Sequence, residues 1–203
     1  MDLKLVSAIG VFCQTVQNSR RSIIGTFEER QEPVPVETTG FALSEELEYL
    51  YSHYDSDLVI PIRNISLPKF ESLSNTQYGY ALVSDDKGNT WKPDPGWPEG
   101  WTVFSMMNDD PVAADTSIKG TPVLAAIEAI DYYMISPSLT VFFQLLTELV
   151  RSSEKHKANE PDSDKHFEEW IAYREHVVMP HFFQQAGRIL DEDCLVNLKR
   201  FLC

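Results

Sequence analysis

Residues 96–115 read GWPEGWTVFSMMNDDPVAAD, and this stretch decides the fold class. Its apolar run, Trp101 to Met107, has the length of a β-strand and lies between a Gly/Pro-rich segment and an Asn/Asp cluster, both of which favour turns. Three further apolar runs with similar borders are Leu58 to Ile62, Tyr78 to Val83 and Pro122 to Ile127. The middle of the chain therefore predicts several short strands with a turn at residues 86–89, although the Ala-rich run 121–130 also suits a helix.

Two helices flank these runs. In LSEELEYLYSHY (residues 43–54), Ser44 can cap a helix whose apolar side chains recur at helical spacing. That stripe is Leu47, Leu50, Tyr51 and Tyr54. Residues 136–138, Ser-Pro-Ser, open a second, strongly amphipathic helix. Residues 41–150 therefore predict an α+β domain in which a mixed or antiparallel sheet packs against helices.

Extra helices are predicted at both ends. Residues 1–40 begin with a helix that packs on the core and continue into a Pro-containing linker, Glu28 to Gly40. The stripe of the N-terminal helix is Leu5, Ile9, Phe12 and Val16. Residues 151–203 form a C-terminal helical extension that begins with an exposed polar loop, residues 152–164. Its first helix begins at Phe167 and is kinked or ended by Pro180, and its last helix begins near Asp191.

The chain is strongly acidic. It has 31 acidic and 17 basic residues and a formal charge of -14, and 16 of the acids but only five bases lie in residues 41–150. This balance argues against nucleic acid as a partner, because phosphate selects for clustered Lys and Arg. Acidity alone keeps a protein soluble, but its concentration in the central domain favours a basic partner.

The cysteines and the hydropathy of the sequence indicate the cellular compartment in which the protein is expected. The three cysteines are widely spread and form no Cys-x-x-Cys pair, so neither a disulfide framework nor a zinc site is indicated and a reducing cytoplasm is expected. The N-terminus carries Asp2 and lacks a basic leader region, so we expect no signal peptide. No stretch approaches the roughly 18 to 20 apolar residues that span a bilayer, and we expect no membrane association.

The common catalytic and ligand-binding motifs are missing. The sequence has no nucleophile motif and no Gly-rich phosphate loop. Four of the five histidines lie in the last third, but their spacings do not place two ligands on one helical face, so we expect no metal and no cofactor. Asp109, Asp110 and Asp115 suit turns between strands first, an acidic recognition surface second, and a carboxylate enzyme using Asp110 and Asp115 last.

Three tryptophans, Trp91, Trp97 and Trp101, lie close together among Pro and Gly residues. The first interpretation is that these rings pack at the end of a sheet. The second is a binding rim, because Trp is favoured at protein interfaces.

With these segments in view, residues 41–150 resemble the SUKH superfamily, whose members include a fungal cell-wall-synthesis regulator and many bacterial immunity proteins. FALSEELEYLYSHYD resembles the early helix of the family, and GWPEGWTVFSMMNDDPVAAD resembles its central strand pair. TPVLAAIEA resembles the next strand, and ISPSLTVFFQLLTELV resembles the closing helix. The chain departs from the family at Asn108-Asp109, where a glycine is common, and at the small pair Ala113-Ala114. The resemblance implies a sheet packed against helices, no catalytic residues, and function by binding.

The leading hypothesis is an immunity protein that binds and neutralises a cognate toxin, such as a basic nuclease, in the cytoplasm. The alternative is a non-enzymatic regulatory scaffold whose terminal helices recruit other proteins. For the first, the expected partner-binding residues are acids near strand turns with one aromatic anchor. They are Asp85, Asp86, Asp94, Trp97, Glu99, Asp109 and Asp110.

Overall fold

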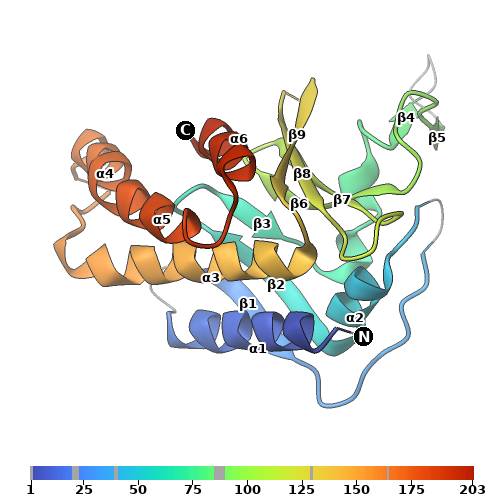
Figure 1. Ribbon diagram of the computed structural model, residues 1–203, viewed down its shortest axis with the longest axis horizontal. Helices are drawn as coiled ribbons and strands as arrows, with labels where there is room; N and C mark the ends of the chain where they lie inside the picture. The colour runs from blue at the N-terminus through green and yellow to red at the C-terminus, as the bar shows by residue number, and fades with distance from the viewer. Residues whose placement is uncertain (1, 20–22, 39–40, 85–89, 129, 164) are drawn as a thin grey trace.

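A seven-stranded antiparallel sheet forms the centre of the protein (Figure 1). The computed structural model describes residues 2–203 except 20–22, 39–40, 85–89, 129 and 164. The strand order is β1-β2-β3-β6-β7-β8-β9. The strands are β1 (Ile24–Glu29), β2 (Tyr54–Ile60), β3 (Ile65–Leu67), β6 (Trp101–Met107), β7 (Asp110–Asp115), β8 (Val123–Ile127) and β9 (Asp131–Ser136). The expected α+β class is confirmed, the sheet is antiparallel, and residues 123–127 of the Ala-rich run form a strand instead of a helix.

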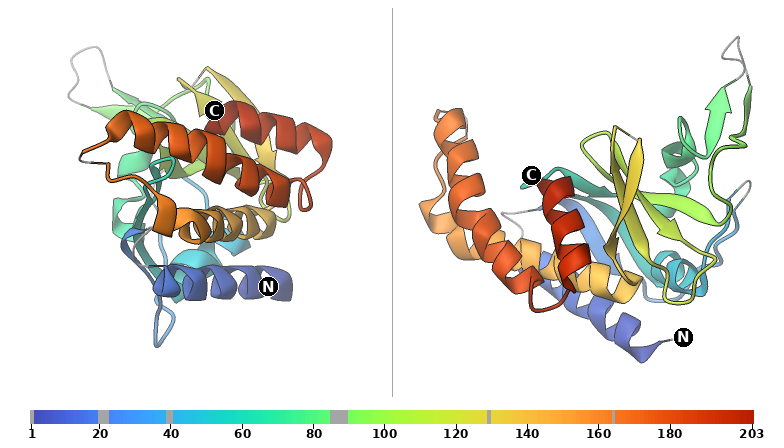
Figure 2. Two further views of the ribbon diagram at one scale, coloured as in Figure 1. Left: turned by 90° about the vertical axis from the view of Figure 1, so that its left-hand side faces the viewer. Right: turned by 45° about the horizontal axis from the view of Figure 1, so that its top comes forward.

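Four helices lie over one face of this sheet (Figure 1, Figure 2). They are α1 (Leu3–Asn18), α3 (Leu139–His156), α5 (Met179–Ala186) and α6 (Glu192–Leu202). Helix α2 (Glu45–His53) runs directly into β2, and α4 (Phe167–Tyr173) lies near the C-terminal end of α3. The expected caps at Ser44 and in the Ser-Pro-Ser segment are confirmed, because Ser44 and Ser138 each accept a hydrogen bond from a first-turn amide, and Asp191 does the same for α6. No helix of the described residues is long and apolar enough to span a bilayer.

The core lies between the helices and the sheet. Its centre joins Phe12 of α1, Phe27 of β1 and Phe143 of α3, with ring centroids 5.0 Å apart for Phe12 and Phe27 and 5.4 Å apart for Phe12 and Phe143. All the residues of the two predicted stripes are buried, although the last of them, Tyr54, belongs to β2 and not to α2. They are Leu5, Ile9, Phe12, Val16, Leu47, Leu50, Tyr51 and Tyr54. The N-terminal helix therefore packs on the core as expected.

Strand β1 was not expected from the sequence. The predicted linker begins inside it, because Glu28 and Glu29 pair with β2. Only Phe27 of its six residues is buried, so the strand lacks the alternation that identifies strands in sequence. Tertiary pairing at the sheet edge, and not local propensity, makes this segment a strand.

The expected polar loop at residues 152–164 is wrong over its first half. Helix α3 continues to His156 and is followed by the single turn η3 (Lys157–Asn159). Ser152 and Ser153 are polar but buried, because α5 packs over this end of α3. Small side chains allow this close approach, and hydropathy alone could not reveal it.

Pro180 does not end the helix that contains it. Helix α4 continues into a π-helical segment (Arg174–Val178), which runs directly into α5. At the end of this segment the amide of Met179 donates to the carbonyl of Arg174, five residues back. Because proline has no amide hydrogen, the hydrogen-bond ladder widens locally before Pro180, and the helix continues instead of ending.

An insertion between β3 and β6 lies over the other face of the sheet, which we call the outer face. It comprises the single turns η1 (Phe70–Ser72) and η2 (Asn75–Gln77) and the strand pair β4 (Leu82–Ser84) and β5 (Trp91–Pro93). The strand expected at residues 78–83 is therefore short and begins late, and the turn expected at residues 86–89 lies outside the described residues. The buried amide of Gln77 holds the insertion in place by bonding both the N–H (3.1 Å) and the carbonyl (2.6 Å) of Val103 beside a bulge in β6.

Candidate functional site

Four aromatic rings meet on the outer face and form what we call the aromatic cluster. Its members are Tyr80, Trp97, Trp101 and Tyr132. The ring of Trp97 lies 6.1 Å from Trp101 and 5.5 Å from Tyr132, in both cases nearly perpendicular. Edge-to-face packing of this kind adds to the energy of burial. All four side chains are nonetheless partly exposed, so the cluster both packs and presents a surface.

The loop between β5 and β6 positions Trp97. The Asp94 carboxylate accepts from the Gly96 amide (2.9 Å), and the Asp94 carbonyl accepts from the Trp97 amide (3.1 Å). The indole N–H of Trp97 then donates to the carbonyl of Trp101 (2.8 Å). Asp94 is therefore a turn residue that orders the loop carrying Trp97, as is typical of Asp before glycine.

Asp109 and Asp110 lie beside the cluster: Asp109 is in the turn between β6 and β7, and Asp110 is the first residue of β7. The hydroxyl of Tyr80 donates to the Asp109 carbonyl (2.7 Å), and the Asp110 carboxylate accepts from the Glu128 amide (2.6 Å). Burial raises the pKa of the Tyr80 hydroxyl, and the charges of Asp110 and Asp109 raise it further. Asp109 is exposed, whereas Asp110 is partly buried. Its bond to Glu128 connects the β6–β7 hairpin to the β8–β9 hairpin.

Tyr132 contacts both Trp97 and Trp101 in the cluster. Burial raises the pKa of its hydroxyl, with smaller contributions from Tyr80 and Asp110. The hydroxyl oxygen is buried and has no hydrogen-bonding partner among the described residues. Such a group costs about 1 to 3 kcal/mol relative to a satisfied one. The cluster thus contains an unsatisfied hydroxyl on Tyr132.

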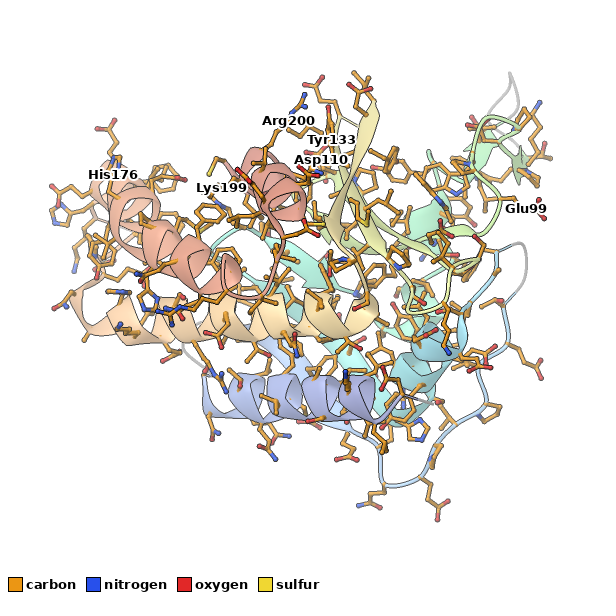
Figure 3. All side chains as sticks on the ribbon, viewed as in Figure 1. Glu99, Asp110, Tyr133, His176, Lys199 and Arg200 are labelled. Carbon is orange, nitrogen blue, oxygen red and sulfur yellow. The ribbon has the colours of Figure 1, made fainter. Side chains whose placement is uncertain are left out.

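The structure brings together only part of the expected binding set. Tyr80 contacts Trp97 and donates to Asp109, and the charge of Asp110 acts on the same hydroxyl. Glu99 is exposed but lies beside the β4–β5 pair, away from Asp110 (Figure 3). Asp85 and Asp86 fall outside the described residues. Trp91 is not part of the cluster, because it stacks on Tyr78 with the ring centroids 4.4 Å apart.

Three carboxylates on the outer face of β1 and β2 were missed; we call them the acidic strand pair. Glu28 lies directly opposite Asp55, and Asp57 is the next residue of β2 on the same face. All three side chains are exposed, and the nearby guanidinium of Arg30 lies 3.4 Å from Asp55. The alternation in YDSDLVI, residues 54–60, could have placed both aspartates on one exposed face.

No family model, curated protein or solved structure matches the chain.

The pair suggested for a carboxylate enzyme does not meet. Asp110 and Asp115 are the first and last residues of β7, which puts them about 17 Å apart at about 3.4 Å per residue. Because the interval is an odd number of residues, their side chains also point to opposite faces. Paired carboxylates of glycoside hydrolases lie about 5 to 10 Å apart, so this pair does not fit such chemistry.

The histidines form no metal site with the acids and cysteines of the described chain, where no group of three or more such side chains could hold an ion. His166 and His176 are exposed on the α4 and π segments, and His156 and His181 contact each other between α3 and α5, with ring centroids 5.4 Å apart.

Proposed function

We propose that the chain is an immunity protein of the SUKH type that neutralises a cognate toxin with a basic surface, such as a nuclease, in the cytoplasm. The observation that carries this proposal is the make-up of the outer face. One end of the sheet carries the partly exposed aromatic cluster, and the other carries the acidic strand pair. Aromatic anchors surrounded by charged groups are typical of protein-binding surfaces.

The two parts of this face have different physical roles in the proposal. Between residues 23 and 60 the chain has nine acidic residues and one basic residue, Arg30. The negative electrostatic potential of these acids attracts a cationic partner before contact and raises the association rate. Trp97 and Tyr132 then supply apolar area, which governs how slowly the complex dissociates. The chain would inhibit the partner by covering its basic surface, without catalysing any reaction.

The test is to express the chain with the protein encoded by its neighbouring reading frame and to measure protection and binding kinetics. Reversal of charge in the double variant Asp55→Lys, Asp57→Lys should slow association about tenfold at low salt, because the steering field is lost. The matched control is Glu168→Lys with Glu169→Lys, which makes the same charge change on α4 and should slow association much less.

A second variant tests the anchor. Trp97→Ala should speed dissociation of the complex while the steering by the acidic strand pair persists. Thermal melting of the free variant must first show that the cluster is still folded, because Trp97 also packs. Failure of the native chain to bind or protect against any neighbouring toxin would refute the proposal.

One observation favours the alternative, a regulatory scaffold. Helix α4 has no buried residue, and its apolar side chains Phe167 and Ile171 are 61% and 41% exposed. An apolar helix face of this kind suits recruitment of another protein. A pull-down that returns host regulatory factors through α4, and is abolished by Phe167→Asp, would favour the scaffold over the immunity protein.

A further inference from the structure

A histidine contact joins the C-terminal half of α3 to α5. The side chain of His181 lies between two residues of α3: its Nδ1 is 2.9 Å from Ser152 Oγ, and its Nε2 is 2.9 Å from Lys155 Nζ. The ring of His156 packs against it edge-to-face. We call Ser152, Lys155, His156 and His181 the histidine cluster.

The two contacts indicate which nitrogen of His181 carries the proton. A charged lysine amine only donates, so Nε2 of His181 must accept from Lys155. The ring is then neutral, and its proton is on Nδ1, where it donates to Ser152 Oγ. Ser152 is fully buried in α3 and cannot turn to solvent. A second proton on Nε2 would face the ammonium group at 2.9 Å, so the contact with Lys155 exists only while His181 is neutral.

The charges around His181 are unfavourable to a second proton. Burial lowers the pKa of His181, and the charges of Lys155, His156 and Arg188 lower it further, against an opposing effect of Glu148. On the adjoining ring, Nε2 of His156 is buried without a hydrogen-bonding partner among the described residues.

The same end of α3 also holds the segment before α5. The hydroxyl of Tyr173 donates to the carbonyl of His156 (2.9 Å), and Tyr173 is the last residue of α4. Helix α4 has no buried residue of its own, and the π segment after it has a distorted hydrogen-bond ladder. The bond from Tyr173 to His156 therefore adds to the contacts that attach this region to α3.

We propose that the histidine cluster is a proton-sensitive contact: when His181 takes up a proton, its bond with Lys155 breaks and α4, the π segment and α5 loosen from α3. Phe182 of α5 stays in the core, which limits the change to looser packing and excludes release of the whole extension. The inference goes beyond toxin binding and does not depend on it. It gives the C-terminal extension a conformational response to mild acid.

The direction of the pH dependence follows from the linkage between proton binding and the stability of the contact. The folded-state pKa of His181 lies below the ordinary value of 6.5, so the closed contact is fully stable above that pH. Stability is lost as the pH falls from 6.5 toward the lowered value. Each pH unit between the two pKa values corresponds to about a tenfold change in the equilibrium between closed and loosened forms.

The test is hydrogen exchange of the full-length protein between pH 8 and pH 5.5, corrected for the intrinsic pH dependence of amide exchange. Protection of α4 and α5 should fall as the pH drops below 6.5 while α1 stays protected. In His181→Gln the amide oxygen can still accept from Lys155 but cannot be protonated, so protection should become independent of pH. His166→Gln, which removes an exposed histidine, should behave as the native protein does.

A spectroscopic measurement decides the matter if His181→Gln folds poorly. The ring resonances of His181 should titrate with a midpoint below 6.5, and Lys155→Met should move that midpoint upward, because it removes a neighbouring positive charge. An ordinary midpoint that Lys155→Met does not move would overturn the proposal. So would an acid-induced loss of protection that persists in a folded His181→Gln variant.

Discussion

At the scale of single residues, a comparison of two glycines distinguishes the cost of backbone strain from the cost of a steric collision. Gly25 of β1 and Gly79 before β4 have nearly the same positive φ, +88° and +85°. An added Cβ at Gly25 would lie 1.9 Å from the carbonyl oxygen of Asp57, whereas nothing lies within 4 Å of one at Gly79. Only at Gly25 does the neighbouring strand forbid a side chain.

Gly25→Ala and Gly79→Ala should therefore differ in stability. Gly79→Ala should cost about 1 to 2 kcal/mol, which is the strain of an alanine at positive φ. Gly25→Ala should cost more than about 3 kcal/mol, because the collision with Asp57 forces β1 away from β2 in addition to that strain. Denaturant unfolding of both variants measures the difference. Equal losses would mean that β1 does not pair with β2 in the register described.

At the scale of elements, ion pairs attach the helix α4–π–α5 to the rest of the molecule. Arg63, beside the turn between β2 and β3, donates two hydrogen bonds to Glu175, at 2.6 and 2.9 Å. Hydrogen bonding from Arg63 lowers the pKa of Glu175 despite partial burial. Burial raises the pKa of Glu160, but Lys157 and Arg174 outweigh it and the pKa falls overall. Both carboxylates therefore bind protons more weakly in the folded state.

These shifts predict a second acid response, separate from that of the histidine cluster. Depressed folded pKa values stabilise above the ordinary value of 4.5, and the stability is lost as the pH falls through the lowered values. Glu175→Gln should cost about 1 kcal/mol at pH 6, a value discounted because the carboxylate is partly exposed. The cost should shrink toward zero at pH 3. Unfolding free energies at both pH values measure this, with the exposed Glu168→Gln as control. A cost that does not depend on pH would contradict it.

The elements also show what could be predicted from the sequence. Strands β2, β6 and β8 could be predicted because each has an apolar run in the sequence. These runs form the mostly buried parts of the strands. The edge strands β1 and β9 were not, because β1 has one buried residue and the burial of β9 is irregular. In the candidate site, Trp97 and Asp109 could be chosen from local composition. Tyr80 and Tyr132 could not, because only the pairing of β8 with β9 and the packing of the insertion bring them to Trp97.

At the scale of the whole molecule, the charge of -14 sets how stability responds to salt. Most of the described ion pairs are local or have a well-exposed partner, such as Arg151–Glu148 and Lys165–Asp162, and such pairs contribute only about 0 to 1 kcal/mol each. The excess of carboxylates is larger than these pairs can offset. Repulsion between acids, as at Glu28 and Asp55, therefore dominates the long-range electrostatics of the fold.

Salt should consequently stabilise this protein. Raising NaCl from 0.01 to 0.1 M shortens the screening length from about 30 to about 10 Å, which weakens repulsion across the molecule more than contact between paired groups. We expect the melting temperature to rise by about 2 to 4 °C, equivalent to about 1 kcal/mol for a chain of this size. The double variant Asp55→Asn, Asp57→Asn should melt higher at low salt and respond less to added salt. A melting temperature that falls with salt would show that specific ion pairs outweigh the net charge, and would weaken the case that these acids are kept for a basic partner.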